Sequence, residues 1–293
     1  MRDAAAHRDA AAHRDADGEQ IDARMTADRR EDKYLLSVEQ ARVVATEVKR
    51  RLVSHRHRGD GANTLPGAHH WVTTVYFDTP SRALFRAANT SVDSHIKLRA
   101  KEYYDLHPEL TETATDARQL VRFQPILWLE LKHKEGANTG KRRIGIPKRD
   151  VPAFFANATI TPEMVKIQEE TYGKEAGAVL AAVATLCASC EEPMRADCLV
   201  NYRRAAWQDP AGDLRITIDS GLAFFAPPDD LWARDWALVR QTLGPTVGAE
   251  PRRVLEIKSH GELPGWLTEL LRAERVEPLP FSKFDAASSA VHG

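Results

Sequence analysis

The chain lacks the features that mark several classes of protein. Its only cysteines, Cys187, Cys190 and Cys198, are odd in number and closely spaced, so we expect no disulfide framework and a cytoplasmic protein. No run approaches the roughly 18 consecutive apolar residues of a membrane-spanning helix, and we expect no secretory signal because the first residues have no apolar core. A Gly-x-x-x-x-Gly-Lys-Ser/Thr loop is also missing, so any use of ATP must rely on another kind of site.

The chain has no excess of charge of either sign. Its 41 basic and 42 acidic side chains give a formal net charge of -1, so no overall field draws the protein onto nucleic acid or an anionic membrane. The rest of the composition is that of a globular protein. With 293 residues, of which 43% are hydrophobic, the chain can bury the core of one large domain or two small ones.

The first residues form a low-complexity segment. Residues 2–7 and 8–13 both read Arg-Asp-Ala-Ala-Ala-His, and a third copy begins at residue 14. A six-residue period fits neither helix nor strand packing and offers only alanine for burial, so we predict that residues 1–28 are disordered. The repeat is either a native tail or the result of a start codon assigned upstream of Met25, and mass spectrometry of the native N-terminus separates the two.

Residues 29–288 read as a single α+β domain dominated by an antiparallel sheet or barrel. Ser37 and Gln40 form a capping box that predicts a helix over 38–53, and Thr161 with Pro162 begins a helical region that extends to about residue 188. A third helix is expected at 263–273. Period-two patterning with β-branched and aromatic residues predicts strands at 71–77, 95–103, 126–134, 141–146, 199–207, 214–219 and 253–258.

Five of these strands have one apolar and one charged face, because side chains two apart on a strand share a face. Four further charged residues, Glu31, Lys33, Arg204 and Lys283, belong to the same set. It contains twelve basic groups: Lys33, Lys97, Arg99, Lys101, Lys132, Lys134, Lys141, Arg143, Arg204, Arg215, Lys258 and Lys283. It contains four acidic groups: Glu31, Glu130, Asp219 and Glu256.

An ordinary half-solvated sheet explains any one of these strands. Such a sheet mixes charges of both signs, however, because like charges opposite one another across strands are destabilising. The pooled excess of positive charge therefore indicates a surface that binds a polyanion. Apart from Trp128, this face offers no aromatic platform for stacking bases, which argues for phosphate groups over nucleic acid. Its few carboxylates suit a hard divalent cation that bridges phosphate oxygens.

Eight short segments occur in an order that resembles a known family. They are Glu31-Asp-Lys33-Tyr, Val75-Tyr-Phe-Asp78-Thr, Lys97-Leu-Arg99-Ala-Lys101, Trp128-Leu-Glu130-Leu-Lys132, Tyr202-Arg-Arg204, Arg215-Ile-Thr-Ile-Asp219, Leu255-Glu256-Ile-Lys258 and Ser282-Lys283-Phe284. Together they resemble the VTC domain, the polyphosphate polymerase branch of the triphosphate tunnel superfamily. The resemblance extends over roughly residues 31–286.

The resemblance implies a fold and an activity. The fold is an antiparallel β tunnel, a closed barrel of about eight strands, with the charged faces turned inward and helices packed outside. The activity is transfer of the γ-phosphate of ATP to a growing inorganic polyphosphate chain, with Mn²⁺ or Mg²⁺ as cofactor. The implied partners are ATP and inorganic polyphosphate, with no nucleic acid and no direct insertion into a membrane.

The resemblance also implies roles for individual residues. Catalytic contacts with phosphate are implied for Lys33, Arg99, Lys132, Arg204, Arg215, Lys258 and Lys283, and further phosphate binding for Lys97, Lys101, Lys134, Lys141 and Arg143. Glu256 matches the metal-binding glutamate of the family, and Glu130 is a second metal-binding candidate. The chain departs from the family at Lys101, where arginine is frequent. Lysine keeps the charge there but loses bidentate geometry.

Two other functions require the same cationic surface. A hydrolase of triphosphate or short polyphosphate replaces the phosphate acceptor with water, and a sensor of polyphosphate or inositol phosphate binds without turnover. Glu256 argues against a sensor, because a carboxylate in an anion receptor is useful only when it binds a metal. Other signals are weaker. Cys187-x-x-Cys190 lacks a fourth ligand at zinc-finger spacing, and His69 and His70 are expected to be exposed near a loop.

Overall fold

The computed structural model describes residues 13–14, 20–21, 29–55, 69–91, 94–104, 126–135, 138–157, 159–172, 176–232 and 238–293. The predicted disorder of residues 1–28 lies almost wholly outside these ranges. Two short strands are the exception: β1 (His13–Arg14) and β2 (Gln20–Ile21) pair in antiparallel orientation. Residues 56–68 and 105–125 also lie outside the described residues.

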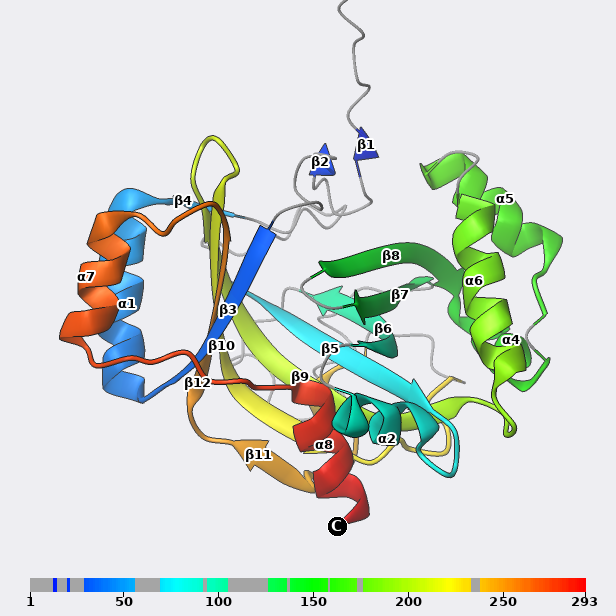
Figure 1. Ribbon diagram of the computed structural model, residues 1–293. Coiled ribbons are helices and arrows are strands. Elements are labelled where there is room, and N and C mark those ends of the chain that lie inside the picture. Colours follow the sequence, from blue (N-terminus) through cyan, green and yellow to red (C-terminus); the bar gives the residue numbers. More distant parts are fainter. Residues whose placement is uncertain are drawn as a thin grey trace, which may run out of the picture.

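One antiparallel sheet of ten strands dominates the described chain, which confirms the predicted α+β class. Eight strands form its continuous path, in the order β3 (Arg29–Leu36), β12 (Arg253–His260), β10 (Leu214–Phe225), β9 (Arg195–Gln208), β5 (His69–Asp78), β6 (Ser94–Tyr104), β7 (Ile126–Glu135) and β8 (Asn138–Pro147). Two short strands, β4 (Val53–Ser54) and β11 (Gly248–Glu250), pair with β9 and β10. The sheet is strongly curved, so that its two ends face each other (Figure 1).

The prediction of a closed barrel is wrong for the described residues. The sheet path begins at β3 and ends at β8, and these two strands do not pair with each other. The free edge of β3 is instead contacted by the C-terminal segment, since the backbone N–H of Leu279 donates to the carbonyl of Lys33 at 2.8 Å. We call β3, β12, β10 and β9 the first wall, and β6, β7 and β8 the second wall. The concave face lies between them.

Most helices cover the outer face of the curved sheet. The helices α1 (Val38–Arg51) and α7 (Gly265–Ala273) pack behind the first wall, and α4 (Val151–Asn157), α5 (Pro162–Tyr172) and α6 (Ala176–Ser189) pack behind the second (Figure 1). The predicted capping box of α1 is present, with both hydrogen bonds between Ser37 and Gln40. The predicted helical region 161–188 is two helices, and the residues between them lie outside the described ranges. Short 3₁₀ turns occur at Lys148–Asp150 and Arg240–Thr242.

The C-terminal helix α8 (Lys283–His292) lies on the concave face, which corrects the prediction that all helices pack outside. Tyr202 shares a face of β9 with Arg204, because the two are two residues apart. Phe284 and Ala287 of α8 pack in one buried cluster with Tyr202 and with Tyr76 of β5. The helix α2 (Ala83–Thr90) borders this cluster, and the Phe284 ring lies edge-on to Phe85 at 5.9 Å.

Polar contacts fix the remainder of α8. Arg82, which precedes α2 in a left-handed conformation with φ 59°, donates to Ser288 Oγ at 2.8 Å from Nη2. Near the other end of the helix, His292 Nε2 lies 2.8 Å from Asp197 Oδ1. The helix is therefore anchored along its length at one end of the concave face.

We expect Phe284→Ala to destabilise the protein by about 3–5 kcal/mol, because its 2% exposed ring packs 5.0 Å from the Tyr76 ring. Chemical unfolding measures this change. Ser289→Ala, at an exposed position of the same helix, is the control and should change the free energy of unfolding by less than about 0.5 kcal/mol. Equal small effects of both substitutions would show that α8 does not pack on the sheet.

Candidate functional site

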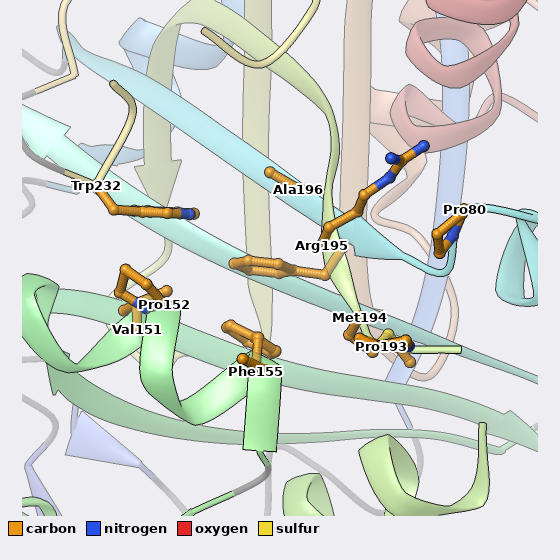
Figure 2. Close-up of a pocket in the computed structure, with 11 residues that line it drawn as sticks. Pro80, Val151, Pro152, Phe155, Pro193, Met194, Arg195, Ala196 and Trp232 are labelled. Atoms are coloured by element: carbon orange, nitrogen blue, oxygen red, sulfur yellow. The ribbon is translucent and has the colours of Figure 1, made fainter. Parts of the chain in front are cut away.

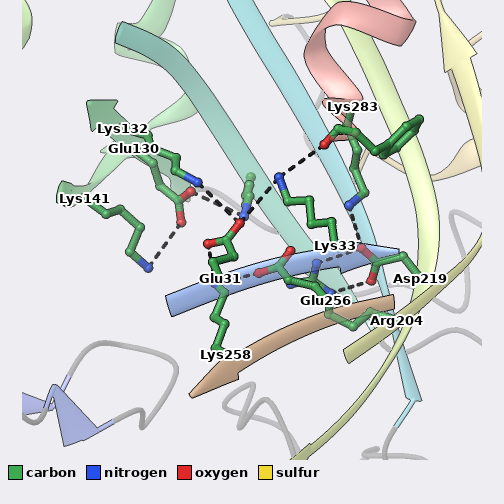
Figure 3. A network of polar contacts seen from close by, with 12 residues as sticks. Glu31, Lys33, Glu130, Lys132, Lys141, Arg204, Asp219, Glu256, Lys258 and Lys283 are labelled. Atoms are coloured by element: carbon green, nitrogen blue, oxygen red, sulfur yellow. Dashed lines mark hydrogen bonds and ion pairs between the residues drawn. The ribbon is translucent and has the colours of Figure 1, made fainter. Parts of the chain in front are cut away.

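Strand register places the predicted charged residues on one face of the sheet. In the first wall, Lys258 lies opposite Arg215 on one side and Glu31 on the other, and Glu256 lies opposite Lys33. The second wall shows the same arrangement, and its cross-strand pairs are Lys97 with Lys132, Arg99 with Glu130, Lys132 with Lys141, and Glu130 with Arg143. Directly paired residues share a face of a sheet. The predicted basic residues of both walls therefore lie on the concave face, where contacts between side chains gather them around three acidic centres (Figure 3).

The first acidic centre is Glu130 in the second wall. Its carboxylate is 1% exposed and lies 2.8 Å from Arg99 Nε, 3.3 Å from Lys101 Nζ, 3.9 Å from Lys141 Nζ and 3.8 Å from Arg143 Nε. Burial opposes ionisation, but the surrounding cations hold the pKa of Glu130 well below its ordinary value. The Arg143 guanidinium also lies over the Trp128 ring, 4.7 Å from its centroid. One buried carboxylate thus holds four cations together.

The second acidic centre is Asp219 in the first wall. Arg204 donates two hydrogen bonds to its carboxylate, at 2.6 Å and 2.8 Å, and Lys283 Nζ of α8 lies 2.7 Å from Oδ2. Burial raises the pKa of Asp219, but the two cations outweigh it and lower that pKa to about 2. Both cations also lie over the Tyr202 ring. This centre joins α8 to the sheet.

The third acidic centre is a pair of carboxylates, Glu31 and Glu256. The Lys258 ammonium bridges them, with Nζ 2.6 Å from Glu256 Oε1 and 3.5 Å from Glu31 Oε2. Lys33 Nζ lies 3.4 Å from Glu31 Oε1. The neighbouring Glu256 raises the pKa of Glu31, but the surrounding lysines outweigh it and lower that pKa to about 2. Two ionised carboxylates therefore lie side by side and share one ammonium.

Lys132 connects the two walls. It belongs to β7, and its Nζ lies 3.7 Å from Glu31 Oε1 of β3. Burial and the nearby cations lower the pKa of Lys132 to about 8, although Glu31 opposes this shift. Burial, together with Arg99, also holds the pKa of Lys101 well below its ordinary value. The crowded cations repel one another, and an added polyanion would relieve that repulsion.

Two of the predicted phosphate-binding residues, Lys97 and Lys134, have other neighbours. Lys97 Nζ contacts the start of α8, at 2.9 Å from Ser282 Oγ and 3.3 Å from Asp285 Oδ1. Lys134 lies opposite His95 in the register of β6 and β7. Nine of the other ten basic residues contact a carboxylate of one of these centres, and Arg215, like Lys97, lies directly opposite a residue that does.

Sequence reasoning missed several residues of the concave face. Glu31 was counted among its charges but not as the carboxylate partner of Glu256. His70 was expected to be exposed, yet it is a 6% exposed residue of β5 that lies opposite Arg204. The period-two alternation that places Arg204 on this face also places Tyr202 there, and the Tyr202 ring lies beneath two cations.

A hollow elsewhere in the fold has none of this chemistry. It lies on the outer side of β5 and is lined by apolar side chains, among them Phe77, Phe155 and Trp232 (Figure 2). Among the described residues that line it, Arg195 is the only charged one, and none is a predicted site residue. The charged concave face is therefore the candidate site. Among the described residues, no helix is both long and apolar enough to cross a membrane.

The comparison with family models agrees with the sequence resemblance. The family model of the VTC domain matches residues 28–292, a range that includes every strand of the continuous sheet path and α8. A solved structure of a Bacillus halodurans protein, described as a candidate adenylate cyclase, is 14% identical with a TM-score of 0.44 and covers 88% of this chain and 96% of its own. No curated protein matches the chain. Since the family model covers most of its length, the chain belongs to the VTC domain family.

Proposed function

We propose that this protein transfers the γ-phosphate of ATP to a growing inorganic polyphosphate chain, with Mn²⁺ or Mg²⁺ as cofactor. The observation that carries the proposal is the gathering of basic residues from both walls and α8 around buried carboxylates on one concave face. Membership of the VTC domain family supports an activity on phosphates. The site offers many phosphate ligands and needs no P-loop.

The reaction asks little covalent chemistry of the protein. An oxygen of the terminal polyphosphate group attacks the γ-phosphorus, the bond from that phosphorus to the β,γ-bridging oxygen breaks, and ADP leaves with the electron pair. The attacking oxygen is already ionised near neutral pH, so no strong general base is required. What remains is alignment of the two oxygens and stabilisation of charge on the transferred group.

The residues divide into two kinds of phosphate ligand. Arg99, Arg204 and Arg215 have planar guanidinium groups that match phosphoryl oxygens in bidentate fashion. Lys33, Lys132, Lys258 and Lys283 supply point charges from four different elements, which suits a chain that passes between the walls. Carboxylates hold most of these cations in place before substrate binds. Removal of one such preorganised contact should cost about 2–4 kcal/mol in the transition state.

The residues of the third acidic centre fit a divalent metal. Glu256 and Glu31 are hard oxygen donors, and the Lys258 ammonium that they share would have to give way to the metal. The described residues contain no group of three or more His, Cys, Asp or Glu side chains suited to a metal, so phosphate oxygens and water would complete the coordination. Bound there, the metal would neutralise charge on the nucleotide phosphates. Glu130 is less suited to this role, because four cations surround it.

A second function, hydrolysis of triphosphate or short polyphosphate, is favoured by one observation. The helix α8 covers one end of the concave face, which limits the room for a long chain to pass through. Water would then take the place of the phosphate acceptor. The cationic ligands would be the same for both reactions.

Purified protein given ATP and Mn²⁺ should produce ADP and a long polymer that exopolyphosphatase degrades. Gel electrophoresis with phosphate-specific staining measures the polymer. Orthophosphate as the sole phosphate product would overturn the polymerase and favour the hydrolase. Binding of polyphosphate without any turnover would favour a sensor.

Glu256→Ala should lower turnover by about 30- to 1000-fold and leave metal-free polyphosphate binding within about threefold of wild type, because its proposed role is to bind the metal. Glu262→Ala removes an exposed carboxylate just beyond β12 and is the control. Turnover rates and binding isotherms give the two readouts. Equal loss of binding and turnover would contradict the role of Glu256.

Tripolyphosphate affinity should fall as pH rises from 7 to 9, because Lys132, with its pKa of about 8, loses its charge in that interval. Lys132→Arg keeps the charge at all these pH values. Over this range the wild-type affinity should fall about tenfold more than that of the variant, as measured by metal-free isothermal titration calorimetry. The same pH dependence in both proteins would exclude Lys132 as a titrating ligand.

A further inference from the structure

The segment that leads into α8 crosses one end of the concave face. It runs beside β3, where the Leu279 N–H donates to the Lys33 carbonyl, and Lys33 Nζ donates to the Phe281 carbonyl at 3.2 Å. It then reaches β6 of the other wall, where Lys97 contacts Ser282 and Asp285. The segment 279–285 therefore connects the two walls at this end. Behind it, the apolar side chains of Phe284 and Ala287 fill the concave face.

Lys97 differs from the other basic residues of the face in its acidic partner. The cations around the three acidic centres pair mainly with carboxylates of the sheet, whereas the carboxylate at Lys97 comes from α8. Asp285 Oδ1 lies 3.3 Å from Lys97 Nζ, in the place that a phosphate oxygen would take. The Lys97 side chain is 13% exposed and that of Asp285 is 34% exposed, so solvent reaches the carboxylate more easily than the ammonium.

A phosphate chain that extends to Lys97 has to overcome two barriers. It must displace the Asp285 carboxylate from the Lys97 ammonium. It must also approach that carboxylate, because the displaced negative charge stays within a few ångströms. The lysine of α8, Lys283, is paired with Asp219 of the sheet and not with Asp285. Phosphate groups would thus be stabilised by the cations of the three acidic centres and repelled where Asp285 covers Lys97.

We propose that Asp285 is a specificity-determining residue that limits how many phosphate groups the concave face holds. It neutralises Lys97 and so withholds this cation from a bound phosphate chain. This inference rests on the proposed function in that the ligand is an inorganic oligophosphate. It adds a boundary, set by a single carboxylate of α8, to the site.

The test is a metal-free and nucleotide-free calorimetric series with tri-, tetra-, penta- and longer inorganic phosphates. Wild-type affinity should reach a plateau with increasing chain length. Asp285→Asn should move that plateau to longer chains and raise the ratio of long-chain to triphosphate affinity about tenfold, as expected for a gained charge-assisted contact. Asp285→Glu should restore the wild-type ratio, which also shows that an altered ratio does not come from misfolding.

The gain must depend on Lys97. Adding Lys97→Met to Asp285→Asn should remove the gain, whereas Glu269→Gln, an exposed substitution on α7 with the same change in net charge, should leave the wild-type ratio unchanged. An unchanged ratio in Asp285→Asn, or a gain that persists without Lys97, would overturn the inference. Because the titration needs no turnover, a failed polymerase assay leaves it standing, and absence of any oligophosphate binding would overturn both proposals.

Discussion

The pairing of buried carboxylates with several cations each is the interaction on which the concave face depends. Glu130 and Asp219 are 1% and 0% exposed, and six basic side chains lie within ion-pair distance of one or the other. Without these carboxylates the cations would repel one another. Buried ion clusters of this kind are weak contributors to stability, because desolvation offsets their Coulomb attraction. The desolvation cost of these ion clusters is consistent with a face that binds a polyanion.

The fold makes this arrangement possible by separating apolar from charged residues on the strands β6, β7, β8, β10 and β12. Outside the sheet, α1 and α7 cover one wall and α4 to α6 cover the other, so the apolar faces are buried against helices. The curvature of the sheet brings the charged faces toward each other, and Lys132 reaches across to Glu31. The helix α8 then fills one end of the space with apolar side chains and adds Lys283 to the charged part. Local alternation and global curvature thus both contribute to the site.

Much of the sheet could be predicted from the sequence because period-two alternation is a local property. All seven predicted strands correspond to strands of the structure, and the capping box of Ser37 and Gln40 located α1. The strand Arg29–Leu36 was missed because its first five residues are all charged and hide the alternation. The helix α8 was missed because it is short and three of its five apolar residues are alanines. Its start carries a recognisable signal, since Ser282 caps the helix and Asp285 follows three residues later.

Features that depend on pairing between distant strands could not be read from the sequence. The open edges of β3 and β8 follow from how far the sheet curves, and no local pattern records that. The contact of Glu31 and Glu256 with the same lysine depends on the register of β3 against β12.

The most direct test of the proposed site is a crystal structure of the protein with tripolyphosphate and Mn²⁺, with the metal located by anomalous scattering. We expect phosphate groups between the two walls, in contact with Arg99, Arg204 and Lys258, and manganese at Glu256 and Glu31. Phosphate bound only on the outer surface, with the carboxylate pairs of the concave face unchanged, would contradict it.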